Sequence, residues 1–232
     1  MRINKYLALS TGMSRRAADT AIAEGRVTVN GNTPSPGQAV QPKDRVLLDG
    51  TPVTPTIAHT TIMLNKPTGY VVSRNGQGSP TVYDLLPPRL HHLKPIGRLD
   101  KDSSGLLLLT DDGQLAQELT HPSRQKVKAY DVTLNKPLGF KEYTALQKGV
   151  TLTDGISHLA VTFAQKHYDT QTLAATYKVR MSEGRKRQIR RTFVTLGYQV
   201  TQLHRTHFGD FSLGTLPAGA WMPVKDAAGH HR

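Results

Sequence analysis

The chain has 232 residues, enough for one large domain or for a small module followed by a medium one. It contains no cysteine, which excludes disulfide frameworks, thiol nucleophiles and cysteine-based zinc or iron–sulfur sites. Thirty Lys and Arg residues against seventeen Asp and Glu residues leave a formal net charge of +13, which predicts a polyanionic partner. No apolar run approaches the roughly eighteen residues of a membrane span, and the first residues lack the apolar continuity of a signal peptide. We therefore expect a soluble cytoplasmic protein without a membrane partner.

The chain begins with two predicted helices. Ile3 and Leu7 lie at helical spacing. Ser14 can cap a second helix over residues 15–24, which Gly25 ends. Both helices precede any strand signal, and the residues around them are rich in arginine and lysine.

Two short strands follow the helices. Residues 26–29 alternate in polarity like a strand, and Asn30-Gly31 is a strong hairpin signal. A later strand over residues 46–48 ends at Asp49-Gly50. The two helices and these strands predict a small α+β module.

An uncharged segment over residues 51–60 carries two prolines and suits a linker. We place a domain boundary near residue 58, which divides the chain into residues 1–58 and residues 59–232. Both parts have a net positive charge.

The second part contains more predicted strands than helices. Strand-like runs occupy residues 61–64, 70–73, 93–99, 106–110, 127–134, 159–164, 172–179 and 199–203. Helical patterns occupy residues 114–120, 140–148 and 185–196. Because strands and helices do not alternate regularly, we expect an α+β fold with a mixed, mostly antiparallel sheet flanked by helices.

Residues 180–191 hold six basic residues and one acidic residue. On a helix that begins at residue 185, Arg187, Arg190 and Arg191 share one broad face. Such a face can simply be solvated, or it can contact phosphates. The positive charge of the whole chain favours phosphate contact.

Two further segments could carry chemistry. Residues 95–109 place Asp100 and Asp102 in a polar turn between apolar strands. Carboxylates are ordinary turn residues, and Arg98 could be a structural ion-pair partner there, but a rigid turn is also where a scaffold presents a reactive side chain. Tyr130, on one strand face with Lys128, is either a surface aromatic or a platform on which an unstacked base stacks.

Other chemistries have little support in the sequence. No Walker P-loop, GxGxxG or GxSxG pattern occurs, so we expect no nucleotide cofactor. His204 and His207 lie three residues apart without a HExxH pattern, so we expect no metal site. Clustered metal-binding carboxylates are not evident either, which disfavours a nuclease.

Taken together, these segments resemble the RsuA/RluB/RluE/RluF family of pseudouridine synthases, which modifies bacterial ribosomal RNA. The first module resembles the S4 RNA-binding domain through Arg2-Ile-Asn-Lys-Tyr-Leu7, Ser14-Arg-Arg16 and Gly25-Arg-Val-Thr-Val-Asn-Gly31. The remainder matches the synthase motifs Leu64-Asn-Lys-Pro67, Gly97-Arg-Leu-Asp-Lys-Asp-Ser-Ser-Gly105, Thr110-Asp-Asp-Gly113, Lys128-Ala-Tyr130, Glu183-Gly-Arg185 and Arg187-Gln-Ile-Arg-Arg191. The resemblance covers essentially the whole chain and implies a pseudouridine synthase catalytic domain over residues 59–232.

The resemblance implies roles for individual residues. Asp100 matches the catalytic aspartate, Tyr130 matches the tyrosine that stacks near the target base, and Arg190 matches the basic residue that pairs with that aspartate. Leu203 falls where the family has an apolar residue that lines the uridine pocket. The other residues expected to contact RNA are Arg2, Lys5, Arg15, Arg16, Arg26, Arg98, Lys128, Arg187 and Arg191.

The implied reaction detaches uridine from its ribose, rotates the base and rejoins it through a carbon, so it needs no cofactor. The nucleotide must first be flipped out of its helix. Asp100 must be ionised, and it acts either as a nucleophile towards the sugar or as the acceptor of the sugar's 2′ proton. Arg190 beside it would favour the charged form.

The implied partner is ribosomal RNA or an assembling ribosomal particle. The N-terminal module and the chain length favour 16S rRNA of the small subunit, whereas residues 205–221 also resemble enzymes that act on 23S rRNA. A non-catalytic RNA-binding or ribosome-assembly factor is the competing interpretation. A monomer is the default expectation.

Overall fold

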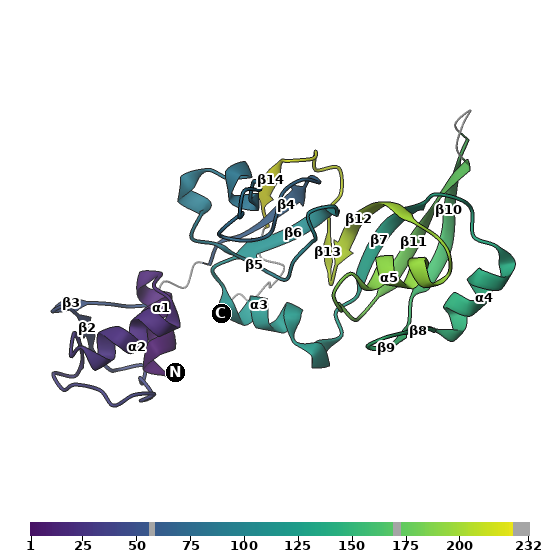
Figure 1. Cartoon of the computed structure of the whole chain (residues 1–232). Coiled ribbons are helices and arrows are strands. Elements are labelled where there is room, and N and C mark those ends of the chain that lie inside the picture. The colour runs from purple at the N-terminus through teal and green to yellow at the C-terminus, as the bar shows by residue number, and fades with distance from the viewer. Residues whose placement is uncertain (56–58, 169–172, 225–232) are drawn as a thin grey trace. The chain divides into compact units, whose positions relative to one another are not determined.

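The computed structural model describes residues 1–55, 59–168 and 173–224. By its internal contacts the chain divides into two units, Met1–His59 and Thr60–Arg232 (Figure 1). Each unit has its own hydrophobic core. No described helix combines the length and the apolar character that crossing a membrane requires.

The N-terminal unit contains two helices and a small antiparallel sheet. Its elements are α1 (Ile3–Thr11), α2 (Arg15–Ala23), β1 (Val27–Val29), β2 (Val46–Leu48) and β3 (Thr51–Pro52). The Ser14 hydroxyl accepts the backbone N–H of Ala17 at 3.1 Å, so the predicted cap of the second helix is confirmed. Ile3, Leu7 and Ile22 pack with the valines of β1 and β2 to form the core.

The hairpin of this unit lies at a different turn from the predicted one. Asn30 and Gly31 both have positive φ and form a tight turn that bridges Val29 and Asn32, but the chain then leaves the sheet. Two prolines follow closely, and proline lacks the N–H that a paired strand needs. The two-residue hairpin is Asp49-Gly50, which joins β2 to β3, so the predicted linker begins inside a strand.

The larger unit is built on one mixed sheet of nine described strands. Their order is β10-β11-β7-β12-β6-β4-β14, with β13 on β12 and β5 on β6. The strands are β4 (Thr61–Lys66), β5 (Lys94–Pro95), β6 (Ser104–Thr110), β7 (Lys128–Leu134), β10 (Ala160–Tyr168), β11 (Leu173–Met181), β12 (Val200–Phe208), β13 (Phe211–Ser212) and β14 (Trp221–Pro223). Every pairing is antiparallel except β12 with β6, which are parallel over only two residue pairs.

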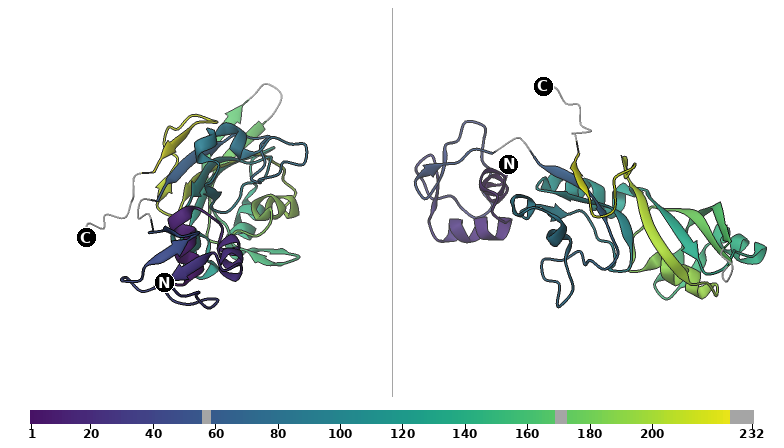
Figure 2. Two further views of the ribbon diagram at one scale, coloured as in Figure 1. Left: turned by 90° about the vertical axis from the view of Figure 1, so that its left-hand side faces the viewer. Right: turned by 90° about the horizontal axis from the view of Figure 1, so that it is seen from above.

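Helices and a hairpin flank this sheet. They are α3 (Gly113–Thr120), α4 (Phe140–Lys148), α5 (Gln188–Thr195), the short 3-10 helices η1 (Val82–Leu85), η2 (Pro88–Leu90) and η3 (Pro122–Arg124), and the hairpin of β8 (Val150–Leu152) with β9 (Gly155–Ser157). In Figure 2 the strands of this unit form one continuous twisted layer, and α5, in light green, lies against it. The predicted α+β class with a mixed, mostly antiparallel sheet is confirmed.

The strand β6 explains the leucine run of the sequence. Leu107 and Leu109 belong to one hydrophobic core, whereas Leu106 and Leu108 belong to another. Successive side chains of a strand point to opposite faces, so β6 is buried on both sides of the sheet. This buried strand is a rigid base for the polar turn that precedes it.

Three predicted elements are shorter in the structure than the sequence predicts. Residues 70–73 form only an isolated bridge between Val71 and Thr81, and the predicted strand over 93–99 is reduced to β5. The last predicted helix begins at Gln188, three residues later than predicted. Arg187 has a left-handed conformation with φ of 50°, so it cannot be part of a right-handed helix. Residue 172, the predicted start of one strand, lies outside the described residues.

Candidate active site

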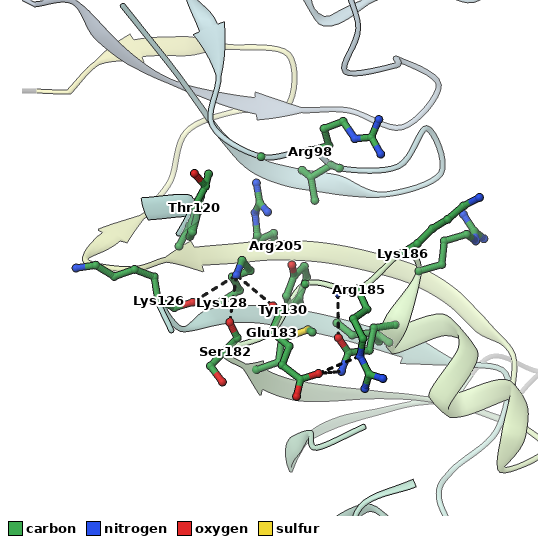
Figure 3. A pocket seen from close by; sticks show the side chains of 18 of the residues that line it. Arg98, Thr120, Lys126, Lys128, Tyr130, Ser182, Glu183, Arg185, Lys186 and Arg205 are labelled. Atoms are coloured by element: carbon green, nitrogen blue, oxygen red, sulfur yellow. Dashed lines mark hydrogen bonds and ion pairs between the residues drawn. The ribbon is translucent and has the colours of Figure 1, made fainter. Parts of the chain in front are cut away.

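A cavity of about 880 Å³ in the larger unit is lined by β7 and β12, by the loop that precedes β6 and by the start of α5. The predicted site residues that line it are Asp100, Tyr130, Leu203, Arg98, Lys128 and Arg187. Figure 3 labels Arg98, Lys128 and Tyr130 among them. These residues come from segments that are widely separated in the sequence, so the sheet brings them together. Arg190 and Arg191 do not line the cavity.

Asp100 lies in the Asp100 loop, residues 96–103, between β5 and β6. Lys66, at the end of β4, is fully buried and donates three hydrogen bonds to this region, to the carbonyl oxygens of Pro67 at 3.0 Å, Asp100 at 3.1 Å and Ser103 at 2.7 Å. Burial lowers the pKa of Lys66 to about 8, although the nearby charges of Asp100 and Asp102 oppose the shift. The Asp100 side chain itself stays 42% exposed. Lys66 therefore holds the backbone of the loop while the carboxylate remains accessible.

Gly105, two residues after this loop, allows β6 and β12 to approach each other closely. It lies opposite Arg205 in the short parallel pairing of β6 with β12. Its φ is +103°, and a Cβ atom at this position would lie 2.2 Å from the carbonyl oxygen of Arg205. Only glycine fits here without displacing a strand.

The arginines of the 187–191 segment bind the loop differently from the prediction. Arg187 forms two hydrogen bonds with the Asp102 carboxylate, at 3.0 and 2.9 Å, and its Nη1 atom lies 3.5 Å from Oδ2 of Asp100. Hydrogen bonding by Arg187 is the main reason that the pKa of Asp102 is lowered. Arg187, rather than Arg190, is the ion-pair partner of Asp100 among the described residues.

Arg190 holds the Asp100 loop through Asp102. Its side chain is only 11% exposed, its Nε lies 3.3 Å from the Asp102 carboxylate, and it donates to the carbonyl oxygens of Asp102 at 2.7 Å and Val200 at 2.9 Å. The expected pair of Arg190 with Asp100 is thus replaced by a pair with Asp102. The late start of α5 accompanies the change, because it leaves Arg187 before the helix in a left-handed conformation and places Arg190 in the first turn.

Asp154 fixes the hairpin of β8 and β9 to α5. Its carboxylate accepts hydrogen bonds from Arg185 at 3.0 Å and from Arg191 at 3.0 and 2.7 Å. Arg191, predicted to contact RNA, therefore already has a partner within the protein. Asp154 was not predicted, because a turn carboxylate in Thr153-Asp154-Gly155 carries no distinguishing signal.

Tyr130 and Arg205 are cross-strand neighbours on the floor of the cavity. Tyr130 on β7 is 8% exposed, and Arg205 on β12 lies directly opposite it. Leu203, two residues before Arg205, lines the same cavity. Arg205 was missed because the predicted strand ended at residue 203, and two further residues of alternation would have placed Arg205 beside Leu203.

The five predicted RNA-contacting residues of the N-terminal unit differ in exposure and in their contacts within the protein. Arg2, Arg15 and Arg16 are exposed and Lys5 is half-buried. Arg26 binds the Asp49 carboxylate, with its Nε donating at 2.8 Å, and also lies 3.4 Å from Glu24. These contacts raise the pKa of Arg26 and engage its guanidinium within the unit.

Comparison with known proteins identifies the family. The profile of the RNA pseudouridylate synthase family matches residues 60–194, and that of the S4 domain matches residues 1–46. The chain belongs to the RNA pseudouridine synthase family. The predicted family and the predicted enzyme class are therefore confirmed.

Three similar proteins illustrate this synthase's relationships. Ribosomal small subunit pseudouridine synthase A of Yersinia pestis is 35% identical over 227 residues, which cover 97% of this chain and 94% of the relative. The dual-specificity RNA pseudouridine synthase RluF of Escherichia coli K12 is 32% identical, over 97% of this chain and 76% of the relative. A crystal structure of a pseudouridylate synthase matches with a TM-score of 0.65 and 31% identity, over 97% of this chain and 96% of that one.

Proposed function

We propose that this synthase isomerises a specific uridine of ribosomal RNA, in the 16S rRNA of the small subunit, with Asp100 as the catalytic carboxylate. The observation that carries the proposal is the common cavity of Asp100, Tyr130 and Leu203, with cationic side chains around it. The relative from Yersinia pestis, named for the small ribosomal subunit and matching over nearly its whole length, supports the choice of RNA. We expect the protein to act as a monomer in the cytoplasm.

The cavity is suited to an extruded nucleotide. Flipping a base out of a helix costs a few kcal/mol, and stacking on an aromatic ring can return about 1–3 kcal/mol. In this proposal Tyr130 supplies the stacking surface, and Leu203, 8% exposed on the neighbouring strand, packs against the base. Arg98 is exposed at the cavity, where it can contact the RNA backbone.

The chemistry requires one ionised carboxylate. The N1–C1′ bond of uridine breaks and a C5–C1′ bond forms, while the proton leaves C5 and N1 gains one. Atoms and electrons balance without a redox partner. Asp100 is accessible at the cavity wall, and Nη1 of Arg187 lies 3.5 Å from its carboxylate. Asp102, Arg190 and Lys66 act as positioning residues for the Asp100 loop.

The N-terminal unit supplies a second contact with the RNA in this proposal. We propose residues 1–58 as the RNA-binding domain and residues 59–232 as the catalytic domain. Arg2, Arg15 and Arg16 are exposed on the first of these and can meet phosphates. A tethered second contact raises the effective concentration of the catalytic domain at one RNA site.

Release of tritium tests the proposal directly, because the reaction breaks the C5–H bond. Ribosomal RNA transcribed with [5-³H]uridine should release tritium into water with the wild-type protein. Asp100→Asn should abolish release and still bind the RNA. Asp131→Asn, one residue from Tyr130 on the opposite face of β7, is the matched control and should retain turnover.

Mapping pseudouridines in rRNA from cells that lack the protein, by carbodiimide labelling, identifies the target. Loss of one pseudouridine from 16S rRNA is expected. Loss from 23S rRNA would correct the choice of subunit. Full turnover by Asp100→Asn, or RNA binding by the wild type without tritium release, would refute the catalytic proposal and favour a binding or assembly factor.

A further inference from the structure

Two cations that line the cavity have no anionic partner among the residues that the structure describes. Arg205 is 2% exposed, and its Nε donates to the carbonyl oxygen of Leu106 at 2.8 Å. Its Nη2 atom is buried and makes no hydrogen bond with the described residues. Figure 3 shows the side chain standing above the β12 ribbon, on the side of Arg98 and Thr120. A buried guanidinium with an unused donor is costly unless something else pairs with it.

Lys128 is the second cation. It is half-buried on β7, and its Nζ reaches only backbone carbonyl oxygens, those of Glu183 at 3.1 Å, Lys126 at 3.4 Å and Ser182 at 3.5 Å (Figure 3). Its Nζ lies 5.3 Å from the centre of the Phe208 ring, and the guanidinium carbon of Arg205 lies 5.1 Å from the same centre. Both cations therefore lie close to the same aromatic side chain.

The carboxylates that line the cavity are already paired. Glu183 accepts hydrogen bonds from Arg185 at 3.1 Å and from Gln188 at 2.7 Å, and Asp154 binds Arg185 and Arg191. Asp100 faces Arg187. Among the described residues, no carboxylate lies within ion-pair distance of Lys128 or Arg205. Burial, followed by the charge of Arg205, lowers the pKa of Lys128, as expected for two like charges without an anion between them.

We propose that Arg205 and Lys128 together bind one phosphodiester group of the RNA, adjacent to the uridine that enters the cavity. The inference rests on the proposed function for the identity of the ligand as RNA. A phosphodiester carries one negative charge and several acceptor oxygens, so it can satisfy the free Nη2 donor and attract both cations at once, leaving one positive charge in place of two. A uracil carbonyl could accept a hydrogen bond from Arg205, but it would leave both charges uncompensated. The charge balance therefore favours phosphate.

Binding of uridine 5′-monophosphate and of uridine separates these two ligands. We expect the wild type to bind the monophosphate at least tenfold more tightly than uridine at low ionic strength, measured by NMR titration. Lys128→Gln and Arg205→Gln should each weaken binding of the monophosphate by about tenfold and change binding of uridine by less than about twofold. Arg205→Lys, which keeps the charge, should recover part of the loss. Inorganic phosphate should compete with the monophosphate and not with uridine.

Lys126→Gln is the matched control, because Lys126 lines the same cavity but lies 3.6 Å from Asp210 and 3.9 Å from Glu118. It should leave the preference for the monophosphate unchanged. If Arg205→Gln does not fold, the comparison of Lys128→Gln with the wild type is sufficient to test the proposal. Equal loss of uridine and monophosphate binding in the variants, or no preference in the wild type, would overturn the proposal. The titration needs no turnover, so absent tritium release would count against the proposed function alone.

Discussion

At the scale of single residues, buried cations organise this site as much as the carboxylate does. Lys66 donates to three carbonyl oxygens around the Asp100 loop, and Arg190 holds the same loop through Asp102 and Val200. For both buried cations, backbone carbonyl oxygens accept the hydrogen bonds that water would otherwise accept. The geometry of Asp100 therefore depends on the protonation of Lys66.

The turnover number should fall as the pH rises through about 8, the pKa of Lys66. The ammonium group has three N–H donors, but the neutral amine has two, so one carbonyl oxygen loses its donor and the Asp100 loop loosens. Unfolding is not the cause of this loss. The pKa is lowered from 10.5 on folding, so the unfolded chain binds more protons between pH 8 and 10.5, and Lys66 makes the unfolding free energy rise with pH there.

Tritium release at saturating RNA, followed from pH 6.5 to 9.5 together with Tm at each pH, checks this prediction. A turnover number that stays flat to pH 9.5 would contradict the role of Lys66. So would a decrease that follows Tm, because the loss would then reflect unfolding.

Arg187 shows backbone strain held at a functional position. Its φ is 50°, which disfavours residues with a Cβ atom, and its side chain binds Asp102. Arg187→Ala keeps the strain and loses the ion pair, whereas Arg187→Gly loses both. We expect the glycine variant to be more stable than the alanine variant by about 1 kcal/mol, with similarly reduced turnover in both.

Urea unfolding of the two Arg187 variants measures this difference, with tritium release as the activity assay. Both variants lack the ion pair and differ by one methyl group, so an alanine variant as stable as the glycine variant would contradict the strain at residue 187.

At the scale of secondary-structure elements, the short parallel contact of β6 with β12 joins the two halves of the sheet. It holds the Asp100 loop next to Leu203 and Arg205, and it depends on Gly105. A strand pairing of only two residue pairs has few hydrogen bonds to lose, so close packing there matters.

Gly105→Ala should destabilise the protein by about 2–4 kcal/mol, because the new methyl group overlaps the backbone of Arg205 and the positive φ adds strain. Gly113→Ala is the matched control: it is the first residue of α3, nothing lies within 4 Å of its Cβ position, and its φ is not positive. That variant should be neutral or slightly more stable. Equal stability of the two alanine variants in chemical denaturation would refute the close approach.

At the scale of the whole molecule, two units with separate cores can divide binding from chemistry. Ile3, Leu7 and Ile22 belong to the N-terminal core, and none of the cavity-lining residues comes from that unit. A domain with its own core can in principle fold alone, so we expect the cavity to persist when the N-terminal unit is removed.

Removing residues 1–58 should raise KM for ribosomal RNA by at least about tenfold and change kcat by less than about twofold. The salt dependence of RNA binding should also become shallower, because phosphate contacts are lost. Tritium release at several RNA and salt concentrations provides both measurements, with Tm as the control for folding. A fall in kcat at unchanged KM would mean that the N-terminal unit takes part in the chemistry itself.

Local signals predicted the parts of this protein that depend on neighbours in the sequence. The cap at Ser14 was predicted because its partner is three residues away, and strand β6 was predicted because its leucines form an unbroken apolar run. The family motifs pointed to Asp100 and Tyr130, which line one cavity. The turn at Asn30-Gly31 was also predicted, but a turn signal does not determine whether the flanking residues stay in a sheet.

The sequence by itself determined the family, the α+β class and the residues around which the site is built, because motif spacing and hydrophobic periodicity are local properties. Only the tertiary structure decided which charges meet. Arg187 faces Asp100, Arg190 pairs with Asp102, and Asp154 binds Arg185 and Arg191. Arg205 and Lys128 have no anionic partner within the described part of the chain. The physical reason is that ion pairing depends on distances of a few ångströms between distant segments, and the start of one helix or one strand pairing changes those distances.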